Sequence, residues 1–279
     1  MIKIITDSTA DYELEQAEAL KISIVPQSVI LNNIEYKDRY DLSPTDFYKT
    51  LMEEDVTPKT SQPSPQDFLN HYLKAKENKD QVIVFTISSK LSGTYQSALI
   101  AKDLAEYDDI YVIDTLTGSQ GLRILIEKTI QLINEHRNIL DIVDKINNYK
   151  NRIKLIAIVD TLEYLYRGGR ISKSSHTLGS LLKLKPILEL KDGVLVPIDK
   201  ARGIKKATNK VIEYINKHSQ IDLNEPIAIG YTGNETNLQT FESLLKEEYG
   251  FDKALHGFIG PAIGAHAGPG ARIVAYVEK

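Results

Sequence analysis

The first half of the chain alternates between two patterns of apolar residues. Short apolar runs at residues 2–6, 81–87 and 110–114 predict buried strands. Between them, apolar residues recur at the spacing of amphipathic helices. Two of these helices are expected to begin at Ser43 and Ser64, each a capping hydroxyl followed by proline. Strands that alternate with helices in this way are typical of a parallel sheet covered by helices.

The second half has a different pattern. Two short apolar runs, 186–190 and 194–198, flank the sequence Lys-Asp-Gly at 191–193, a spacing and composition that predict a β-hairpin. Hairpins mixed with helices are typical of an α+β fold with antiparallel strands. We therefore expect an N-terminal α/β domain with a parallel sheet at 1–155 and a C-terminal α+β domain with antiparallel strands at 156–279.

Composition narrows the class of protein. The 279 residues are 42% hydrophobic and 26% charged, as in soluble globular proteins. The net charge of −4 and the lack of a nucleic-acid-binding motif argue against nucleic acid as a partner. The absence of cysteine excludes disulfides, thiolate nucleophiles and cysteine-based zinc sites. No apolar stretch approaches the roughly 18 residues of a membrane helix, and the N-terminal apolar run is too short for a signal peptide. We therefore expect a cytoplasmic protein that is not an integral membrane protein.

Hydroxyl groups and glycines gather in three segments that lie far apart in the sequence, at residues 60–64, 88–94 and 260–270. Each segment lies at the edge of a predicted strand or helix, where folds commonly place ligand-binding groups. In the first segment a helix cap explains Ser64, but it does not explain the hydroxyls that precede it. Together the segments predict a pocket that holds a polar headgroup with hydroxyls and one histidine.

The segment at 88–94 follows a predicted strand and enters a helix. Capping requires one hydroxyl, that of Ser92, whereas the segment supplies four around Gly93. Such a turn presents backbone amides and the positive end of the helix dipole to an anion. We therefore favour an anion site over ordinary capping.

The segment at 260–270 contains four glycines, two prolines and no Lys, Arg, Asp or Glu. Loops of this composition let the backbone approach a ligand closely. His266 is the only titratable residue in the segment, and its neighbours are Ala, Gly and Pro. No second histidine or carboxylate lies at ligand spacing, so a metal site is not expected.

Two basic positions have both an ordinary and a functional interpretation. Arg170 follows Gly168-Gly169, a sequence that suits a helix C-cap as well as a phosphate or protein contact. Arg202 belongs to a basic cluster for which a solvated face is the simpler interpretation. It precedes Gly203 on a predicted turn, from which it can project outward.

Six motifs occur in order along essentially the whole chain. They are Asp-Ser-Thr-x-Asp at 7–11, Thr-Ser-Gln-Pro-Ser at 60–64, Ser-Ser-x-Leu-Ser-Gly-Thr-Tyr at 88–95, Gly-Gly-Arg-Ile at 168–171, Lys-Pro-Ile-Leu at 185–188, and Ile-Gly-Pro through His-x-Gly-Pro-Gly at 259–270. Each motif alone is weak, but six in this order are specific. On these motifs the sequence resembles the DegV family, the fatty-acid-binding proteins that include the binding subunits of bacterial fatty-acid kinase.

The resemblance implies a lipid pocket between the two domains, in which a long acyl chain is buried. It implies that Thr60 and Ser92 hold the carboxylate, with Ser61 and Gly93 beside them and His266 nearby. It also implies a carrier with no cofactor and no turnover of its own. A partner ATP-dependent kinase subunit phosphorylates the bound fatty acid, and the acyl-phosphate product feeds the acyltransferases of phospholipid synthesis.

The same resemblance gives the basic residues a role, because Arg170 and Arg202 match positions that look suited to docking the kinase. No arginine lies in the three hydroxyl- and glycine-rich segments. We therefore expect neutral donors to hold the carboxylate and leave it nucleophilic, where a bidentate arginine would mask both oxygens. A protonated His266 would then stabilise the charge of the added phosphate.

Two other classes of function stay open. Ser92 and His266 could serve as nucleophile and base of a lipid hydrolase or acyltransferase, although the sequence lacks the Gly-x-Ser-x-Gly elbow. An enzyme that binds a sugar phosphate or nucleotide is the third class. The third class predicts a polar pocket, whereas the carrier predicts a long apolar tunnel.

Overall fold

A four-stranded parallel sheet forms the N-terminal part of the structure, a computed structural model that describes residues 1–54, 56–171, 184–236 and 238–279. The strand order is β2-β1-β6-β7. The strands are β1 (Ile2–Asp7), β2 (Ile22–Val25), β6 (Gln81–Thr86) and β7 (Ile110–Asp114). The helical elements between them include η1 (Ser8–Ala10), α1 (Leu14–Ala19), α3 (Pro65–Asn78) and α4 (Thr94–Ala105).

Alternate residues of this first sheet face two different cores. Val82 and Val84 belong to a core that they share with α3 and α4. Ile83 and Phe85 face the other side, where they join the core around α5 (Ser119–Asn134). The first sheet is therefore buried on both faces, as expected for parallel strands.

A second sheet of six strands follows in the order β10-β9-β8-β13-β11-β12. Adjacent strands of this sheet are antiparallel, except that β11 and β12 are parallel. The strands are β8 (Ile153–Ile158), β9 (Leu184–Lys191), β10 (Val194–Arg202), β11 (Ala228–Tyr231), β12 (Leu255–Phe258) and β13 (Arg272–Val277).

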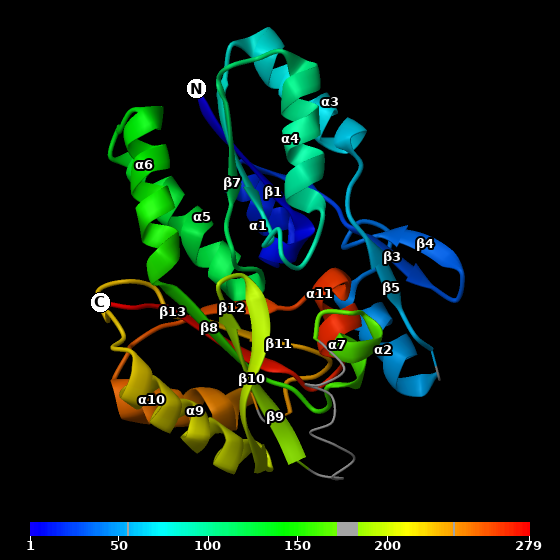
Figure 1. Cartoon of the computed structure of the whole chain (residues 1–279), viewed down its shortest axis with the longest axis vertical. Coiled ribbons are helices and arrows are strands. Elements are labelled where there is room, and N and C mark those ends of the chain that lie inside the picture. Colours follow the sequence, from blue (N-terminus) through cyan, green and yellow to red (C-terminus); the bar gives the residue numbers. More distant parts are fainter. Residues whose placement is uncertain (55, 172–183, 237) are drawn as a thin grey trace.

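The second sheet lies between helices on both sides. Helices α9 (Ile204–His218) and α10 (Leu238–Tyr249) cover one face, and α5 packs against β8, β11 and β13 on the other. Figure 1 shows α5 between the two sheets, with α9 and α10 on the far side of the second. Helix α6 (Ile139–Tyr149) packs on α5, and η2 (Lys150–Arg152) leads from α6 into β8.

A small third sheet brings distant segments of the chain together. It has the antiparallel order β4-β3-β5, formed by β3 (Ser28–Leu31), β4 (Ile34–Lys37) and β5 (Lys59–Ser61). Helix α11 (Pro261–Ala267) packs against β3, β5, α2 (Pro44–Glu53) and α7 (Glu163–Arg167). The packing places the first and third hydroxyl- and glycine-rich segments side by side (Figure 1).

These elements confirm the predicted fold class, with parallel strands in the N-terminal half and mainly antiparallel strands in the C-terminal half. The predicted caps are also present, since Ser43 and Ser64 each accept a hydrogen bond from the amide three residues later. The predicted hairpin joins β9 to β10 through Asp192 and Gly193, whose φ angles of 50° and 82° require the left-handed region.

The glycine-rich segment at 260–270 differs from the prediction, because most of it is helix α11 rather than a loop. Pro261 occupies the first turn, where its missing N–H costs nothing. Gly264 lies within the helix, where a Cβ would collide with the hydroxyl of Tyr48. This glycine therefore permits close packing rather than a flexible loop.

The division into two domains at residue 155 stays a prediction. Strand β8 begins at Ile153, two residues before that boundary. Helix α5 belongs to the N-terminal side but packs on the second sheet, so one core contains residues from both halves. Within the described part of the chain, no helix is long and apolar enough to cross a membrane.

Candidate functional site

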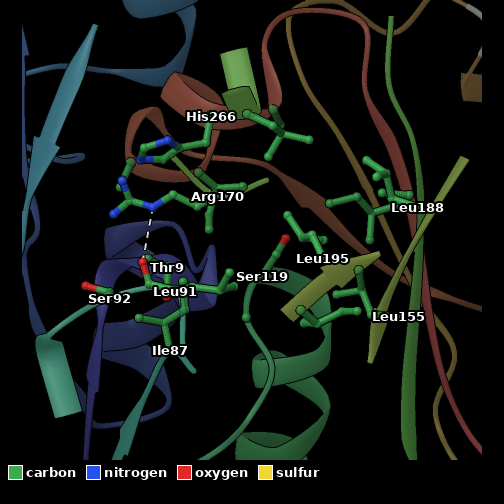
Figure 2. Close-up of a pocket in the computed structure, with 18 of the residues that line it drawn as sticks. Thr9, Ile87, Leu91, Ser92, Ser119, Leu155, Arg170, Leu188, Leu195 and His266 are labelled. Atoms are coloured by element: carbon green, nitrogen blue, oxygen red, sulfur yellow. Dashed lines mark hydrogen bonds between the residues drawn. The ribbon is translucent and has the colours of Figure 1, made fainter. Parts of the chain in front are cut away.

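A cavity lies where the first two sheets meet the third sheet and α11. Six apolar side chains of the second sheet line it, namely Leu155, Ala157, Leu188, Leu190, Leu195 and Ile273. Polar side chains line it as well, among them Thr60, Ser92, Arg170 and His266. Figure 2 shows the polar groups at one end of the cavity and the leucines of the second sheet at the other.

Strand periodicity explains the apolar part of the cavity. Leu155 and Ala157 are two residues apart on β8, and Leu188 and Leu190 are two residues apart on β9, so each pair points to the same face of the sheet. Leu195 comes from the neighbouring strand β10. One face of the second sheet therefore forms an apolar wall.

Thr60 and His266 meet at the polar end, with 2.8 Å between Thr60 Oγ1 and His266 Nε2. The other ring nitrogen, Nδ1, is buried beside Gly168 and has no partner among the described residues. Burial, reinforced by the charge of Arg170, lowers the pKa of His266 to about 3. The ring is therefore neutral near pH 7, and only one of its two nitrogens carries a proton.

We assign that proton to Nε2 of His266, because a buried acceptor without a partner is tolerated better than a buried donor without one. In this tautomer Nε2–H donates to Thr60 Oγ1. The hydroxyl proton of Thr60 is then free to donate to a ligand in the cavity.

Ser92 has an analogous arrangement on the other side of the polar end. Gln27 Nε2 donates to Thr94 Oγ1 at 2.9 Å, and Thr94 Oγ1 lies 2.9 Å from Ser92 Oγ. The backbone amide of Thr94 also donates to Ser92 Oγ, at 3.4 Å. With Ser92 Oγ accepting from Thr94, the hydroxyl proton of Ser92 is also free for a ligand.

The backbone amides of the second segment differ from the expected anion-binding turn. The amides of Leu91 and Ser92 both donate to the carbonyl of Ser88, so they are used within the turn. Gly93 is the N-cap residue of α4, and Ser92 Oγ accepts a hydrogen bond from the amide of Thr94, the first residue of the helix. The side-chain hydroxyls, not these amides, are the donors that face the cavity.

Arg170 changes the expectation of a site with neutral donors alone. Its side chain lines the cavity beside His266, and Nε donates to the carbonyl of Leu91 at 3.1 Å (Figure 2). Nη1 donates to the carbonyl of Gly168. Burial lowers the pKa of this guanidinium. A cationic group therefore lies at the polar end, and the expected protonated His266 is absent because the ring is neutral there.

The other predicted site residues lie outside the cavity lining. Ser61 is exposed on β5, one residue beyond Thr60 and on the opposite face of the strand. Gly93 lies under the side chain of Gln62, which a Cβ would displace. Arg202 is exposed at the end of β10. The roles given to these three residues stay predictions.

The turn after β1 serves both as a cap and as part of the cavity lining. Asp7 accepts from the amide of Thr9 at 2.9 Å and from the amide of Ile87 at 2.8 Å. Burial raises the pKa of Asp7. Thr9 itself lines the cavity. The same turn therefore caps η1 through Asp7 and contributes Thr9 to the cavity.

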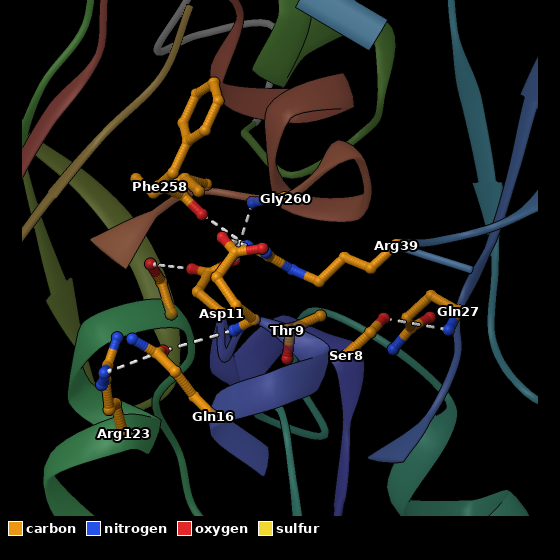
Figure 3. Close-up of polar contacts among 12 residues, drawn as sticks. Ser8, Thr9, Asp11, Gln16, Gln27, Arg39, Arg123, Phe258 and Gly260 are labelled. Atoms are coloured by element: carbon orange, nitrogen blue, oxygen red, sulfur yellow. Dashed lines mark hydrogen bonds and ion pairs between the residues drawn. The ribbon is translucent and has the colours of Figure 1, made fainter. Parts of the chain in front are cut away.

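A buried polar cluster behind the cavity fixes the ends of two helices (Figure 3). Asp11 accepts from Ser119 Oγ at 2.6 Å, at the start of α5, and from the amide of Gly260 at 2.8 Å, at the start of α11. Nη2 of Arg39 lies 3.5 Å from Oδ1 of Asp11 and also donates to the carbonyl of Phe258. Burial raises the pKa of Asp11, and the charge of Arg39 opposes that shift.

Sequence reasoning missed the polar residues Gln27 and Ser119, which also line the cavity. Both form hydrogen bonds with residues far away in sequence, so no local sequence pattern identifies them as site residues. Within the described residues, no three His, Asp or Glu side chains gather as a metal site.

The fold and the cavity define a class of α/β protein with a largely apolar cavity that has hydroxyl groups at one end. The family model described as uncharacterised protein, DegV family, matches residues 1–279. The chain therefore belongs to the DegV family.

Individual proteins agree with this assignment. A DegV domain-containing protein of Caldanaerobacter subterraneus is 37% identical over 279 residues, which cover 100% of this chain and 99% of the relative. The structure of a DegV family protein from Thermus thermophilus, described as fatty acid binding, is 32% identical, covers 99% of both chains and has a TM-score of 0.88. The fatty acid kinase B3 protein of Streptococcus pneumoniae, loaded with linoleic acid, is 24% identical and shares the fold, with a TM-score of 0.88 and complete coverage of both chains.

Proposed function

We propose that this protein binds a long-chain fatty acid, with the carboxylate at Thr60 and Ser92 and the acyl chain along the leucines of the second sheet. The observation that carries the proposal is one cavity with an apolar wall and two hydroxyl protons free at its polar end. The third class of function, an enzyme for sugar phosphates or nucleotides, predicts a polar cavity and is disfavoured for the same reason.

The energetics suit this ligand. Each buried methylene contributes about 0.8 kcal/mol, so a long chain supplies most of the affinity. A buried carboxylate is costly unless its oxygens are hydrogen-bonded. An ionised carboxylate only accepts hydrogen bonds, and the two free hydroxyl protons match that need. Arg170 adds electrostatic attraction from the wall of the same cavity.

The proposal includes presentation of the carboxylate to a partner kinase. A carboxylate oxygen attacks the γ-phosphorus of ATP, the bond to the bridging oxygen breaks, and acyl-phosphate and ADP form. The partner supplies ATP and the phosphoryl-transfer machinery, and acyltransferases of phospholipid synthesis consume the product. Arg170 and Arg202 are the proposed docking residues. The shared fold of the Streptococcus protein is compatible with this role.

A hydrolase or acyltransferase that uses Ser92 and His266 is less well supported. His266 Nε2 is bonded to Thr60, not to Ser92, whose hydroxyl contacts Thr94. The pKa of about 3 also makes His266 a weak base. Turnover of a chromogenic acyl ester that disappears in Ser92→Ala would favour the hydrolase instead.

Reconstitution tests the kinase part of the proposal. The chain, loaded with oleate, is mixed with a bacterial fatty-acid kinase catalytic subunit and ATP, and acyl-phosphate is trapped as the hydroxamate. We expect product only when both proteins are present, and less product with Arg202→Gln. Product formation without this chain, or none with both proteins, would contradict the role of presenting subunit.

A further inference from the structure

A second cavity lies at the end of β8 and β9 beside the β9–β10 hairpin, and it extends to the face of the second sheet that α9 covers. Its volume is about 330 Å³, which falls within the range of small-molecule sites. Along β9, Leu188 lines the first cavity and Glu189 and Lys191 line the second, as strand alternation predicts, whereas Leu190 lies between the cavities and lines both. On β8, Leu155 and Lys154 are divided in the same way.

Three lysines from different elements line the second cavity. Lys150 comes from η2, Lys154 from β8 and Lys191 from the end of β9. Ile156 pairs with Glu189 in the antiparallel pair of β8 and β9. Lys154 lies two residues before Ile156 and Lys191 two residues after Glu189, so both lysines lie at the same end of the sheet. The like charges of Lys154 and Lys191 on neighbouring strands repel each other unless an anion lies near them.

Lys150 has no carboxylate within ion-pair distance among the described residues. Its Nζ donates to the backbone carbonyl of Asp114 at 2.8 Å and keeps further protons available. The side chain is half-buried, and burial lowers the pKa of Lys150. By contrast, Lys154 is paired with Glu278 at 3.2 Å. The ammonium of Lys150 is thus partly removed from water beside an open cavity.

The remaining lining provides neutral donors and an aromatic surface. Tyr214 donates to Glu189 Oε2 at 2.8 Å, so this carboxylate already has a partner. The rings of Tyr214 and His218 lie 4.5 Å apart between centroids. Ser219 and Tyr276 join their hydroxyls at 2.6 Å.

We propose that the second cavity binds a small anion that carries a phosphate group, with Lys150 and Lys191 as its principal contacts. Lysine binds phosphate as a compact point charge with three donors, and it needs no planar geometry. The lining also holds two carboxylates, Glu189 and Asp192, so its three lysines leave one positive charge in excess. Glu189 is hydrogen-bonded to Tyr214, and Asp192 is exposed at the hairpin tip.

Calorimetry on the full chain without fatty acid tests the site. The probes are inorganic phosphate and AMP, each titrated at constant ionic strength with sodium chloride as the compensating salt. We expect one saturable site, weakened about tenfold or more in Lys150→Gln, as for loss of a hydrogen bond to a charged group. Tighter binding of AMP than of phosphate would support a ligand with an aromatic ring, and equal binding would support recognition of the phosphate alone.

Two further variants keep the test decisive. Lys191→Gln changes an exposed residue at the hairpin, so its folding is expected to be unaffected, and it should also weaken binding. Lys217→Gln removes an exposed lysine that is adjacent in sequence to His218 but outside the lining, and it should bind like wild type. The absence of saturable binding of either probe, or an equal loss in Lys217→Gln, would overturn the proposal.

Discussion

The two cavities share strands β8 and β9 but present opposite chemistry. The first is lined by Leu155 and Leu188 and ends in hydroxyl groups. The second is lined by Lys154 and Glu189, which precede or follow those leucines by one residue. Strand alternation thus places apolar side chains in the first cavity and charged side chains in the second, although Leu190 lines both. The loops that reach each face then decide which ligand it can hold.

The two cavities also differ in the chemical type of their polar groups. In the first cavity, neighbours orient neutral hydroxyls as donors, and one guanidinium lies beside them. In the second, lysine ammonium groups line the wall. The difference predicts that the first cavity discriminates by ligand shape and hydrophobicity, and the second by charge.

The largest effect should come from placing a charge on the apolar wall. Leu195→Asp puts a carboxylate into the first cavity, where an unpaired charge costs several kcal/mol. We expect fatty-acid binding to fall by about a hundredfold or more, as measured by displacement of a fluorescent fatty acid. The matched control is Val196→Asp, the exposed neighbour on the opposite face of β10. Equal binding by both folded variants would contradict the apolar wall as the acyl site.

Removal of one hydroxyl should have the next largest effect. Thr60→Val keeps the shape of the side chain but removes a hydrogen bond to a charged headgroup, worth about 1.5–3 kcal/mol. The same displacement assay should show affinity lower by about ten- to a hundredfold. Ser61→Ala, on the exposed face of β5, should bind normally. A stronger effect at Ser61 than at Thr60 would reverse the headgroup assignment.

Substitutions of the two arginines should have different effects on fatty-acid binding. Arg170→Gln removes the cation from the first cavity and should weaken fatty-acid binding by about three- to tenfold, less so at high salt. Arg202→Gln changes an exposed residue outside the lining and should leave binding intact. Loss of binding in Arg202→Gln would show that its role is not confined to docking.

The smallest effect concerns pH and His266. Burial lowers its pKa from the ordinary 6.5 to about 3, so between these values the native state binds fewer protons than the unfolded chain. The resulting stability is present above pH 6.5 and is lost as the pH falls toward 3. Denaturant unfolding of the ligand-free protein at pH 6.5 and pH 5 should show that wild type loses on the order of 1 kcal/mol more than His266→Gln. Equal losses would mean that His266 is not buried in its neutral form.

Much of the fold was accessible from the sequence because it rests on local signals. The alternation of strands and helices, the caps at Ser43 and Ser64 and the Asp192–Gly193 hairpin each follow from residues close together in the chain. Helix α11 was not predicted, because Gly264 is a poor helix former and is accepted only through its close packing against Tyr48. Strand β5 is three residues long and exists only by pairing with β3.

The candidate site was only partly accessible for the same reason. The composition of their segments singled out Thr60, Ser92 and His266, which line one cavity. Gln27, which orients Thr94 and through it Ser92, acts across 67 positions of sequence. Arg170 reaches the cavity because the turn after α7 aims it there, and its charge therefore could not be assigned to the site beforehand.

Lipid analysis tests the central claim most directly. The protein is purified without added lipid and examined by native mass spectrometry, before and after incubation with oleate, and the bound lipid is then extracted and identified. We predict one fatty acid per chain in the wild type and in Val196→Asp, and none in Leu195→Asp. A wild-type protein that contains no fatty acid and takes up none on incubation would contradict the account.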